Sequence, residues 1–297
     1  MKSKFTPVVP HSGSGYENQK NNFILVSKKI FFICSVILLV SCQDVVKVDL
    51  DTAPPKLVID ASINWEKGTA GNLQTIKLST TTGFYSNVIP SVSGAIIFIT
   101  NSANTAFNFT EQVPNTGQYI CNNFIPIIGE TYVLTVNYAG QTYIATEKMI
   151  AVPDISNITQ RNNAGFTANE IEVKFFFQDN GLENNSYLAK FITTVNAFPE
   201  YDAFDDHFTQ GNEMFSLYSN KDLKTGNTIN FTLYGVSTQY FNYMKILLGI
   251  SGSTGGGPFQ TPPATVRGNI VNQTNETNNC LGYFRLCEVD KLQYVVQ

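Results

Sequence analysis

The densest group of residues that could do chemistry is an acidic segment, Tyr201-Asp202-Ala203-Phe204-Asp205-Asp206-His207-Phe208. The carboxylates of Asp202, Asp205 and Asp206 suit a hard cation such as Ca²⁺, which takes about six to eight oxygen ligands. The simpler interpretation is a solvated acidic loop without a metal. A calcium site at these three aspartates is therefore one prediction, with the metal-free loop as its alternative.

Catalytic machinery has little support in the sequence. His207 is the only histidine after residue 42, and no Gly-x-Ser-x-Gly segment accompanies it, so a Ser-His-Asp triad lacks its usual setting. Asp and Glu residues are plentiful, but a glycosidase pair is defined by separation in space, which the sequence does not give. We predict a protein that is not an enzyme, with a hydrolase using unrecognised carboxylates as one alternative.

Cysteines leave two interpretations open near the C-terminus. Cys280 and Cys287 are the only close pair after residue 42, with Cys121 far from both. Their spacing would suit a small disulfide-closed loop, whereas the absence of a nearby histidine argues against zinc. A Cys280–Cys287 disulfide and a pair of buried thiols remain the alternatives.

Aromatic side chains offer a binding surface, because the chain has 14 Tyr and 22 Phe. Tyrosine and phenylalanine rings stack on sugars or clamp peptides when they face outward. Tyr240 and Tyr243 on a predicted helix, and Phe259 in a Gly/Pro-rich segment, are the candidate ligand contacts. The alternative for each of them is burial in the core.

The first 42 residues read as a targeting segment rather than as part of the fold. Lys28 and Lys29 precede an apolar run over 30–40, and this run is about half as long as a membrane-spanning helix requires. The following Leu39-Val40-Ser41-Cys42 resembles the lipobox of bacterial lipoproteins, which implies cleavage after Ser41 and lipidation of Cys42. Because 1–25 form a polar extension, we also predict an over-extended start within this signal peptide.

Charge excludes one class of partner. Without residues 1–42 the chain has 14 basic and 22 acidic residues, a net charge of −8. Affinity for nucleic acid comes mainly from Lys and Arg that neutralise phosphates, so we expect no nucleic-acid binding. Lipid chains on Cys42 would instead give a stable membrane anchor.

The elements that must position these residues are mostly strands. Only 14% of residues are charged, and short β-branched or aromatic runs alternate with turn residues. The predicted strands are 57–63, 73–79, 94–100, 132–138 and 141–146, then 170–178, 186–193, 214–218, 228–233 and 283–289. Ala139-Gly140 is a predicted two-residue hairpin turn. Tyr240, Tyr243, Met244 and Leu247 recur at helical spacing after Ser237, which predicts one amphipathic helix capped by that serine.

These elements predict a mainly β protein in two parts. Residues 43–55 are a short acidic, proline-ended stretch that suits a tether. An Ig- or fibronectin-like β-sandwich is predicted for 56–152, because about seven short strands fall in roughly a hundred residues. Pro153 marks the boundary, and 153–297 form a second β-rich domain with the helix.

A set of short motifs then carries a family resemblance. In chain order they are Lys56-Leu57-Val58-Ile59, Ser93-Gly94-Ala95, Thr116-Gly117-Gln118-Tyr119, Gly129-Glu130-Thr131-Tyr132, Val152-Pro153, Asp206-His207-Phe208, Pro258-Phe259-Gln260-Thr261-Pro262, Gly268-Asn269-Ile270 and Leu281-Gly282-Tyr283-Phe284. This order resembles lipoproteins of the domain of unknown function 4249 family, from the lipobox to about Phe284. A polar insert over 272–280 departs from the family pattern.

The resemblance implies location and company rather than chemistry. Members of the family are outer-membrane lipoproteins that are often encoded beside TonB-dependent transporters. We therefore expect a lipid-anchored outer-membrane protein facing the cell exterior, which binds a ligand or assists a TonB-dependent receptor without being an enzyme. A structural or adhesive surface protein is the main alternative. No cofactor is expected apart from the Ca²⁺ considered above.

Overall fold

The computed structural model describes residues 53–165, 168–251 and 266–297, and the prediction of a mainly β protein is confirmed over them. The strands of the first half are β1 (Leu57–Glu66), β2 (Gln74–Thr80), β3 (Ile96–Thr100), β4 (Ala106–Glu111), β5 (Gln118–Cys121), β6 (Thr131–Tyr138) and β7 (Gln141–Ile150). The second half contains β8 (Ile155–Ala164), β9 (Glu170–Gln178), β10 (Ser186–Thr193), β11 (Glu200–Asp205), β12 (Glu213–Asn220), β13 (Thr228–Val236), helix α2 (Thr238–Ile250), β14 (Val271–Asn272) and β15 (Leu281–Val295). No helix in these ranges has the length and hydrophobicity to cross a membrane.

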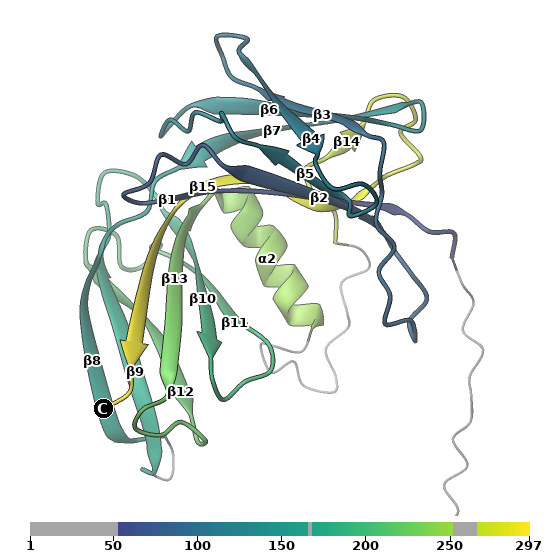
Figure 1. Ribbon diagram of the computed structural model, residues 1–297. Helices are drawn as coiled ribbons and strands as arrows, with labels where there is room; N and C mark the ends of the chain where they lie inside the picture. The colour runs from purple at the N-terminus through teal and green to yellow at the C-terminus, as the bar shows by residue number, and fades with distance from the viewer. Residues whose placement is uncertain (1–52, 166–167, 252–265) are drawn as a thin grey trace, which may run out of the picture. The chain divides into compact units, whose positions relative to one another are not determined.

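Seven strands of the first half and the start of β15 form a sheet that closes on itself. The order is β15-β1-β2-β5-β4-β3-β6-β7, and β7 pairs back onto β15 (Figure 1). Alternate residues of each strand point inward, for example Ile59, Ala61 and Ile63 of β1, which are fully buried. This interior is the first hydrophobic core.

The β6–β7 hairpin confirms a turn prediction in detail. Tyr138 pairs with Gln141, so Ala139 and Gly140 are the two loop residues, with φ of 48° and 73°. Two successive positive φ values fit the type I′ turn, whose twist matches that of the flanking strands. Glycine supplies one of them without steric cost.

Strand β15 belongs to both halves of the chain. Its first part runs parallel to β1, from Leu281 opposite Val58 to Val289 opposite Glu66. Its second part runs antiparallel to β13, from Val289 opposite Tyr234 to Val295 opposite Thr228. Strand β15 therefore connects, through hydrogen bonds, strands that precede and strands that follow Pro153. A domain boundary at Pro153 remains a prediction.

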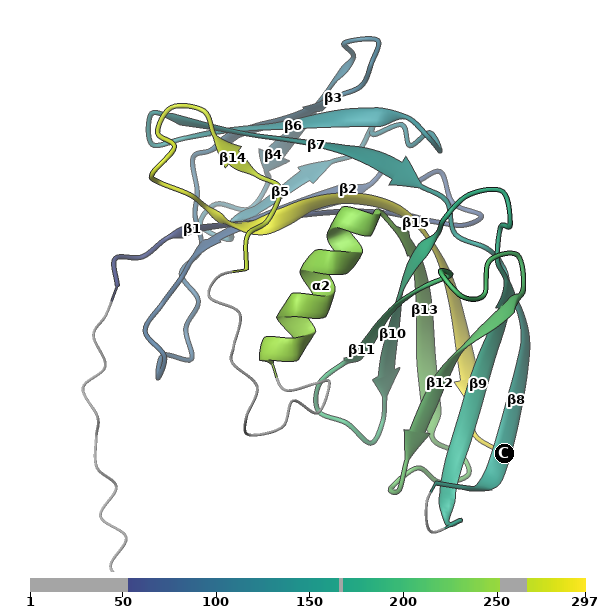
Figure 2. The same ribbon diagram turned by 180° about the vertical axis from the view of Figure 1, so that it is seen from behind.

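The second half is layered. Strands β12-β9-β8 form a separate sheet that faces β10 and β13 across a core rich in phenylalanine (Figures 1 and 2). Phe175 of β9 stacks on Phe231 of β13, with ring centroids 4.4 Å apart. Ile229, Phe231 and Leu233 point into this core, whereas the intervening face of the same strand is left for α2.

Helix α2 covers the opposite face of β10, β13 and β15, as both views of the ribbon show (Figures 1 and 2). The Ser237 side chain accepts a hydrogen bond from the Tyr240 N–H, so the predicted helix and its N-cap are confirmed. The helix runs to Ile250 and ends at Ser251. Its buried residues Tyr240, Met244 and Leu248 form a third cluster with Leu188 of β10 and Tyr283 of β15.

Candidate functional site

Two of the predicted site residues, Cys42 and Phe259, lie outside the described residues, as do the predicted signal peptide and most of the tether. The described residues give the calcium prediction no support, because no group of three or more His, Cys, Asp or Glu within the described ranges could hold a metal ion. Asp202 and Asp205 lie on the edge strand β11 rather than in a loop, and both are exposed. The next carboxylate, Asp206, follows the end of the strand and is buried. Its carboxylate instead accepts a hydrogen bond from the Asn185 N–H at 2.7 Å.

The predicted disulfide is wrong, because Cys121, Cys280 and Cys287 are free and buried. Cys280 immediately precedes β15 and Cys287 lies within it, so the extended chain separates them by about 3.3 Å per residue, far beyond the ~7 Å limit for a bridge. Each thiol has a local partner: the Cys280 Sγ contacts the Ile270 carbonyl, and the Cys287 Sγ contacts the Ile63 carbonyl. The alternative interpretation, a pair of buried thiols, describes the structure.

The two tyrosines predicted on the helix are brought together with a third. Tyr240 and Tyr243 stack at 5.9 Å between centroids, and each lies 4.9 Å from the ring of Tyr283 on β15. Tyr240 is buried and Tyr243 half-buried. Burial raises the pKa of Tyr240 to about 12, so its hydroxyl stays neutral at physiological pH.

A cavity of about 820 Å³ opens beside Tyr240. We call it the tyrosine cleft. Its walls are the outward faces of β1 and β2, parts of β10, β11, β13 and β15, and the side of α2 that carries Met244, Leu247 and Leu248. The charged and aromatic side chains of the lining are Asp60, Lys77, Lys190, Tyr201, Tyr234, Tyr240 and Arg285. Tyr243 packs behind Tyr240 and does not line the cleft.

Arg285 is the buried charge of this cleft, with only 9% of its surface exposed. It lies on β15 between Tyr283 and Cys287, on the face of the strand that points away from the core inside the closed sheet. One Nη donates to the Asn64 Oδ1 at 2.8 Å and also contacts the Cys287 Sγ. The rings of Tyr234 and Tyr240 flank its guanidinium at 5.0 and 5.3 Å, distances at which a cation is attracted to a ring face.

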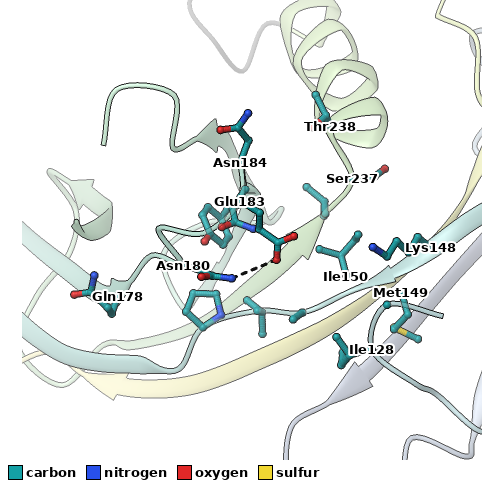
Figure 3. A pocket seen from close by; sticks show the side chains of 17 residues that line it. Ile128, Lys148, Met149, Ile150, Gln178, Asn180, Glu183, Asn184, Ser237 and Thr238 are labelled. Carbon is teal, nitrogen blue, oxygen red and sulfur yellow. Dashed lines mark hydrogen bonds between the residues drawn. The ribbon is translucent and has the colours of Figure 1, made fainter. Parts of the chain in front are cut away.

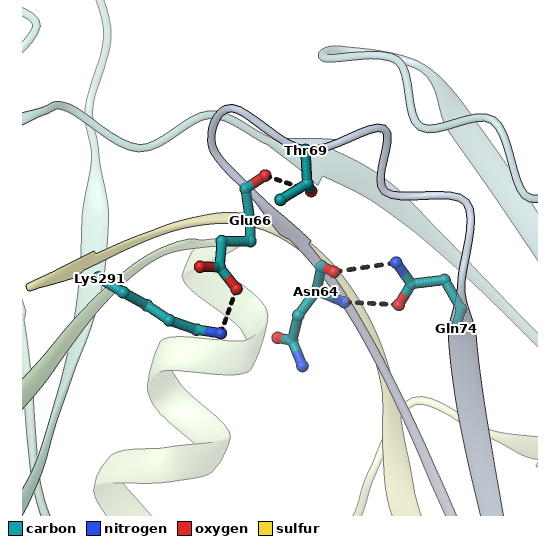
Figure 4. A network of polar contacts seen from close by, with 5 residues as sticks. All are labelled: Asn64, Glu66, Thr69, Gln74 and Lys291. Atoms are coloured by element: carbon teal, nitrogen blue, oxygen red, sulfur yellow. Dashed lines mark hydrogen bonds and ion pairs between the residues drawn. The ribbon is translucent and has the colours of Figure 1, made fainter.

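The register of β1 on β15 explains this arrangement. Ser62 is opposite Arg285 and Asn64 is opposite Cys287, so the outward row of β1 runs beside the outward row of β15. At the end of this row the Gln74 side chain replaces the strand ladder, as Figure 4 shows. Its Oε1 accepts from the Asn64 N–H at 3.1 Å and its Nε2 donates to the Asn64 carbonyl at 2.9 Å. The same view shows the ion pair of Lys291 with Glu66 just beyond the cleft.

A second cavity, of about 550 Å³, lies where the segment after β7 meets the loop after β9 (Figure 3). Asn180 donates to Glu183 at 3.3 Å on its wall. The Gln178, Tyr187 and Ser237 side chains of the wall bond instead to groups outside the lining. No buried charge lies among the described residues of this wall. We regard the tyrosine cleft, which contains a buried cation, as the candidate functional site.

One family model matches most of this chain. The model of the family "Domain of unknown function (DUF4249)" matches residues 43–293, which cover most of the chain. The chain belongs to the DUF4249 family. The resemblance found in the sequence motifs is confirmed. No curated protein matches this DUF4249 chain at a significant level.

Solved structures similar to this DUF4249 protein are distant. A segment of two fibronectin type III domains from chicken tenascin is 11% identical, covering 63% of this chain and 89% of that one, with a TM-score of 0.20. A cytokine receptor complex is 7% identical over 61% and 83% of the two chains, with a TM-score of 0.24. Domains FN1–FN3 of chicken CNTN1 are 11% identical, covering 62% of this chain and 61% of that one, with a TM-score of 0.23. TM-scores this low do not establish a shared fold.

Sequence reasoning on this DUF4249 chain missed Arg285. The signal was present in the predicted strand 283–289, where an arginine interrupts a run of apolar and aromatic residues. Arginine is rarely buried without a partner, so its position in a core strand marks a special environment. The alternation of the strand also places it on the same face as Tyr283 and Cys287.

Proposed function

We propose that this DUF4249 protein is a non-enzymatic, lipid-anchored protein that captures a small ligand in the tyrosine cleft. The observation that carries the proposal is the cleft itself, a concave space in which tyrosine rings and the aliphatic side chains of α2 face a larger set of polar and charged side chains, including the buried Arg285. Ligand sites are typically concave, combine apolar walls with polar groups that orient the ligand, and are largely formed before the ligand arrives. The absence of a nucleophile–base pair in the sequence motifs agrees with binding rather than turnover.

Membrane attachment is the second part of the proposal. Lipidation of Cys42 would hold the body at the outer membrane, on the side facing the cell exterior, through a tether over 43–55. Labelling cells with a palmitate analogue tests the anchor: the Cys42→Ser variant should lose the label, whereas Cys34→Ser should keep it. Label retained by Cys42→Ser would contradict the anchor.

The partner that we propose is a TonB-dependent receptor, to which the protein would present its ligand. This proposal rests on the company that DUF4249 lipoproteins keep, as the sequence resemblance implies. Affinity purification of the tagged protein should recover such a receptor, and deletion of the gene should reduce uptake of the receptor's substrate. If neither effect is observed, the transporter link is wrong.

The alternatives make different predictions. An adhesive or structural role predicts binding of the protein to surfaces or other cells without a soluble ligand. A hydrolase with unrecognised carboxylates predicts turnover of glycans or peptides that is abolished by an Asp→Asn variant. The cleft favours ligand capture over the first alternative, and the sequence motifs favour it over the second.

We also propose that the closed sheet is an Ig-like sandwich sealed by β15. Strands β1-β2-β5 and β3-β6-β7 pair in the order expected of two such sheets, with β4 bonded to both β3 and β5. Strand β15 then fills the gap between β1 and β7. An experimental structure in which β1 and β7 pair directly would contradict this description.

A further inference from the structure

We propose that the tyrosine cleft receives an organic carboxylate, whose anionic group pairs with Arg285 while its apolar body packs against α2. This inference rests on the proposed ligand-capture function and names the ligand class. It starts from the fact that Arg285 is a buried cation without an anionic partner among the described residues. Its Nε, moreover, is fully enclosed and has no hydrogen-bond acceptor.

The groups in direct contact with the guanidinium are neutral, and the Asp60 carboxylate acts on its charge without forming an ion pair with it. Asn64 contributes an amide oxygen, and Tyr234 and Tyr240 contribute ring faces. Burial raises the pKa of both tyrosines to about 12, and it raises the pKa of the Cys287 thiol even though Arg285 acts in the opposite direction. A buried charge is costly unless it is paired, so an anion that forms an ion pair with Arg285 would stabilise the cleft.

The wider lining of the cleft has the same sign. Its charged side chains are Lys77, Lys190 and Arg285 against one carboxylate, Asp60, although the chain as a whole carries an excess of acidic residues. Asp60 makes no ion pair with Arg285 and accepts a hydrogen bond from the Ser62 hydroxyl at 2.6 Å. Local positive charge in an acidic protein favours the entry of an anion.

The geometry favours a carboxylate over a phosphate. Arginine presents a planar fork of hydrogen-bond donors that suits the oxygens of a carboxylate. One Nη of Arg285 is engaged by Asn64 and its Nε is enclosed, so an anion in the cleft would meet the other Nη, which makes no hydrogen bond to the described residues. A carboxylate, with a single charge, matches this one donor, whereas a phosphate, with more oxygens and more charge, would also have to reach Lys77 or Lys190. The neighbouring wall carries the apolar side chains of Met244, Leu247 and Leu248. The same wall fits a ring or short alkyl chain on the ligand.

Calorimetry on the purified full chain tests the proposal. The probes are hydrocinnamate and hexanoate as carboxylates, hydrocinnamamide as the neutral match, and phenyl phosphate as the phosphate match. We expect both carboxylates to bind more tightly than the amide. Arg285→Met should weaken carboxylate binding by about thirtyfold or more, the factor for roughly 2 kcal/mol lost with one partner of a buried charge pair, and should weaken amide binding far less, because the neutral amide forms no ion pair.

Arg161→Met is the matched control, since it removes the same charge from an exposed position on β8, and it should change nothing. Arg285→Lys keeps the charge without the fork and should bind carboxylates with intermediate affinity, which preserves the test if the methionine variant does not fold.

Equal binding of carboxylate and amide, equal carboxylate binding by the wild type and the Arg285 variants, preference for phenyl phosphate, or no binding of any probe would each overturn the carboxylate assignment. These results are distinguishable from failure of the proposed function. Amide binding that persists in the wild type would keep ligand capture while removing the anion. Loss of the transporter link would show itself in purification and uptake, whatever the calorimetry gives.

Discussion

Gly235 provides a sharp test of how the two halves of the chain are joined. It lies on β13 opposite Tyr187 of β10, at the point where the segment after β7 crosses the strand. A Cβ built at Gly235 would lie 1.8 Å from the carbonyl oxygen of Ala151 and 3.2 Å from the nitrogen of Val152. Both obstacles are backbone atoms, so no side-chain rotation can relieve the contact.

The cost of Gly235→Ala follows from these distances. The Ala151 carbonyl would have to move by about 1.5 Å to reach an ordinary C···O separation of ~3.3 Å. That movement would also displace Val152, which is buried and whose N–H donates to the Glu288 carboxylate at 3.0 Å. Overpacking costs about 1–3 kcal/mol, and a hydrogen bond to a charged group contributes about 1.5–3 kcal/mol. We expect the variant to lose about 3 kcal/mol or more of its unfolding free energy.

Urea unfolding followed by circular dichroism measures this loss as a lower midpoint at unchanged m. Thermal unfolding should show a midpoint lower by about 6 °C or more, at ~2–4 °C per kcal/mol for a domain of this size. The control is Gly83→Ala, because a Cβ at that exposed glycine meets nothing within 4 Å. Replacing a glycine of compatible conformation stabilises by about 0.4–1 kcal/mol, so the control should be neutral or slightly more stable.

Whether Gly235→Ala lowers or raises stability tests the close contact between 151–152 and β13. Gly235 does not have a positive φ, so backbone entropy alone predicts that alanine stabilises the strand. If Gly235→Ala were as stable as the wild type or more so, the close passage of 151–152 across β13 would be wrong.

Three further predictions concern the environment of the cleft. Gln74→Leu should lower the unfolding free energy by about 2 kcal/mol or more, because it leaves the N–H and carbonyl of Asn64 without hydrogen-bond partners. An unchanged urea midpoint would contradict the two hydrogen bonds between Gln74 and Asn64. Cys280 and Cys287 should resist iodoacetamide in the native protein at neutral pH, since burial raises both thiol pKa values, that of Cys280 to about 11; both should react in denaturant without a reductant, and a need for reductant would restore the disulfide. Burial also raises the pKa of Glu147, so the folded state holds this proton to higher pH than the unfolded state, and stability falls as pH rises from about 4.3 through the raised value. Glu147→Gln should flatten the melting temperature across that interval, and an unaltered pH profile would exclude a buried carboxyl there.

Local patterning predicted much of the secondary structure. The predicted bounds 170–178 and 186–193 coincide with β9 and β10, because both strands have strong apolar or aromatic runs bounded by turn residues. Two of the missed strands, β8 and β11, lack that signal. β8 (Ile155–Ala164) is polar on both faces and pairs only with β9 at the edge of the small sheet. β11 contains the acidic residues that suggested a calcium loop, and an edge strand tolerates such charges because one side remains in water.

The candidate site was half visible in the sequence. The spacing of Tyr240 and Tyr243 after Ser237 predicted a helix with a tyrosine face, which the structure packs on Tyr283. Arg285 and Asn64 are 221 residues apart, and the local sequence of neither segment predicts their contact. Their contact depends on the parallel pairing of β15 with β1, and pairing between distant strands is settled by packing of the whole sheet rather than by local preference.

By itself, the sequence determined the mainly β character, the Ala139-Gly140 hairpin, the serine-capped helix and the membership of the DUF4249 family. The first three depend on residues close together in the chain, where backbone preferences and side-chain alternation act directly, whereas family membership depends on the order of short motifs along the chain. Only the tertiary structure decided that β15 closes one sheet and continues into the next, that Cys280 and Cys287 lie too far apart on one extended strand to bond, and that an arginine without an anionic partner lines a tyrosine cleft. Those outcomes follow from long-range register, in which a shift of one residue would turn Arg285 away from the cleft and into the closed core.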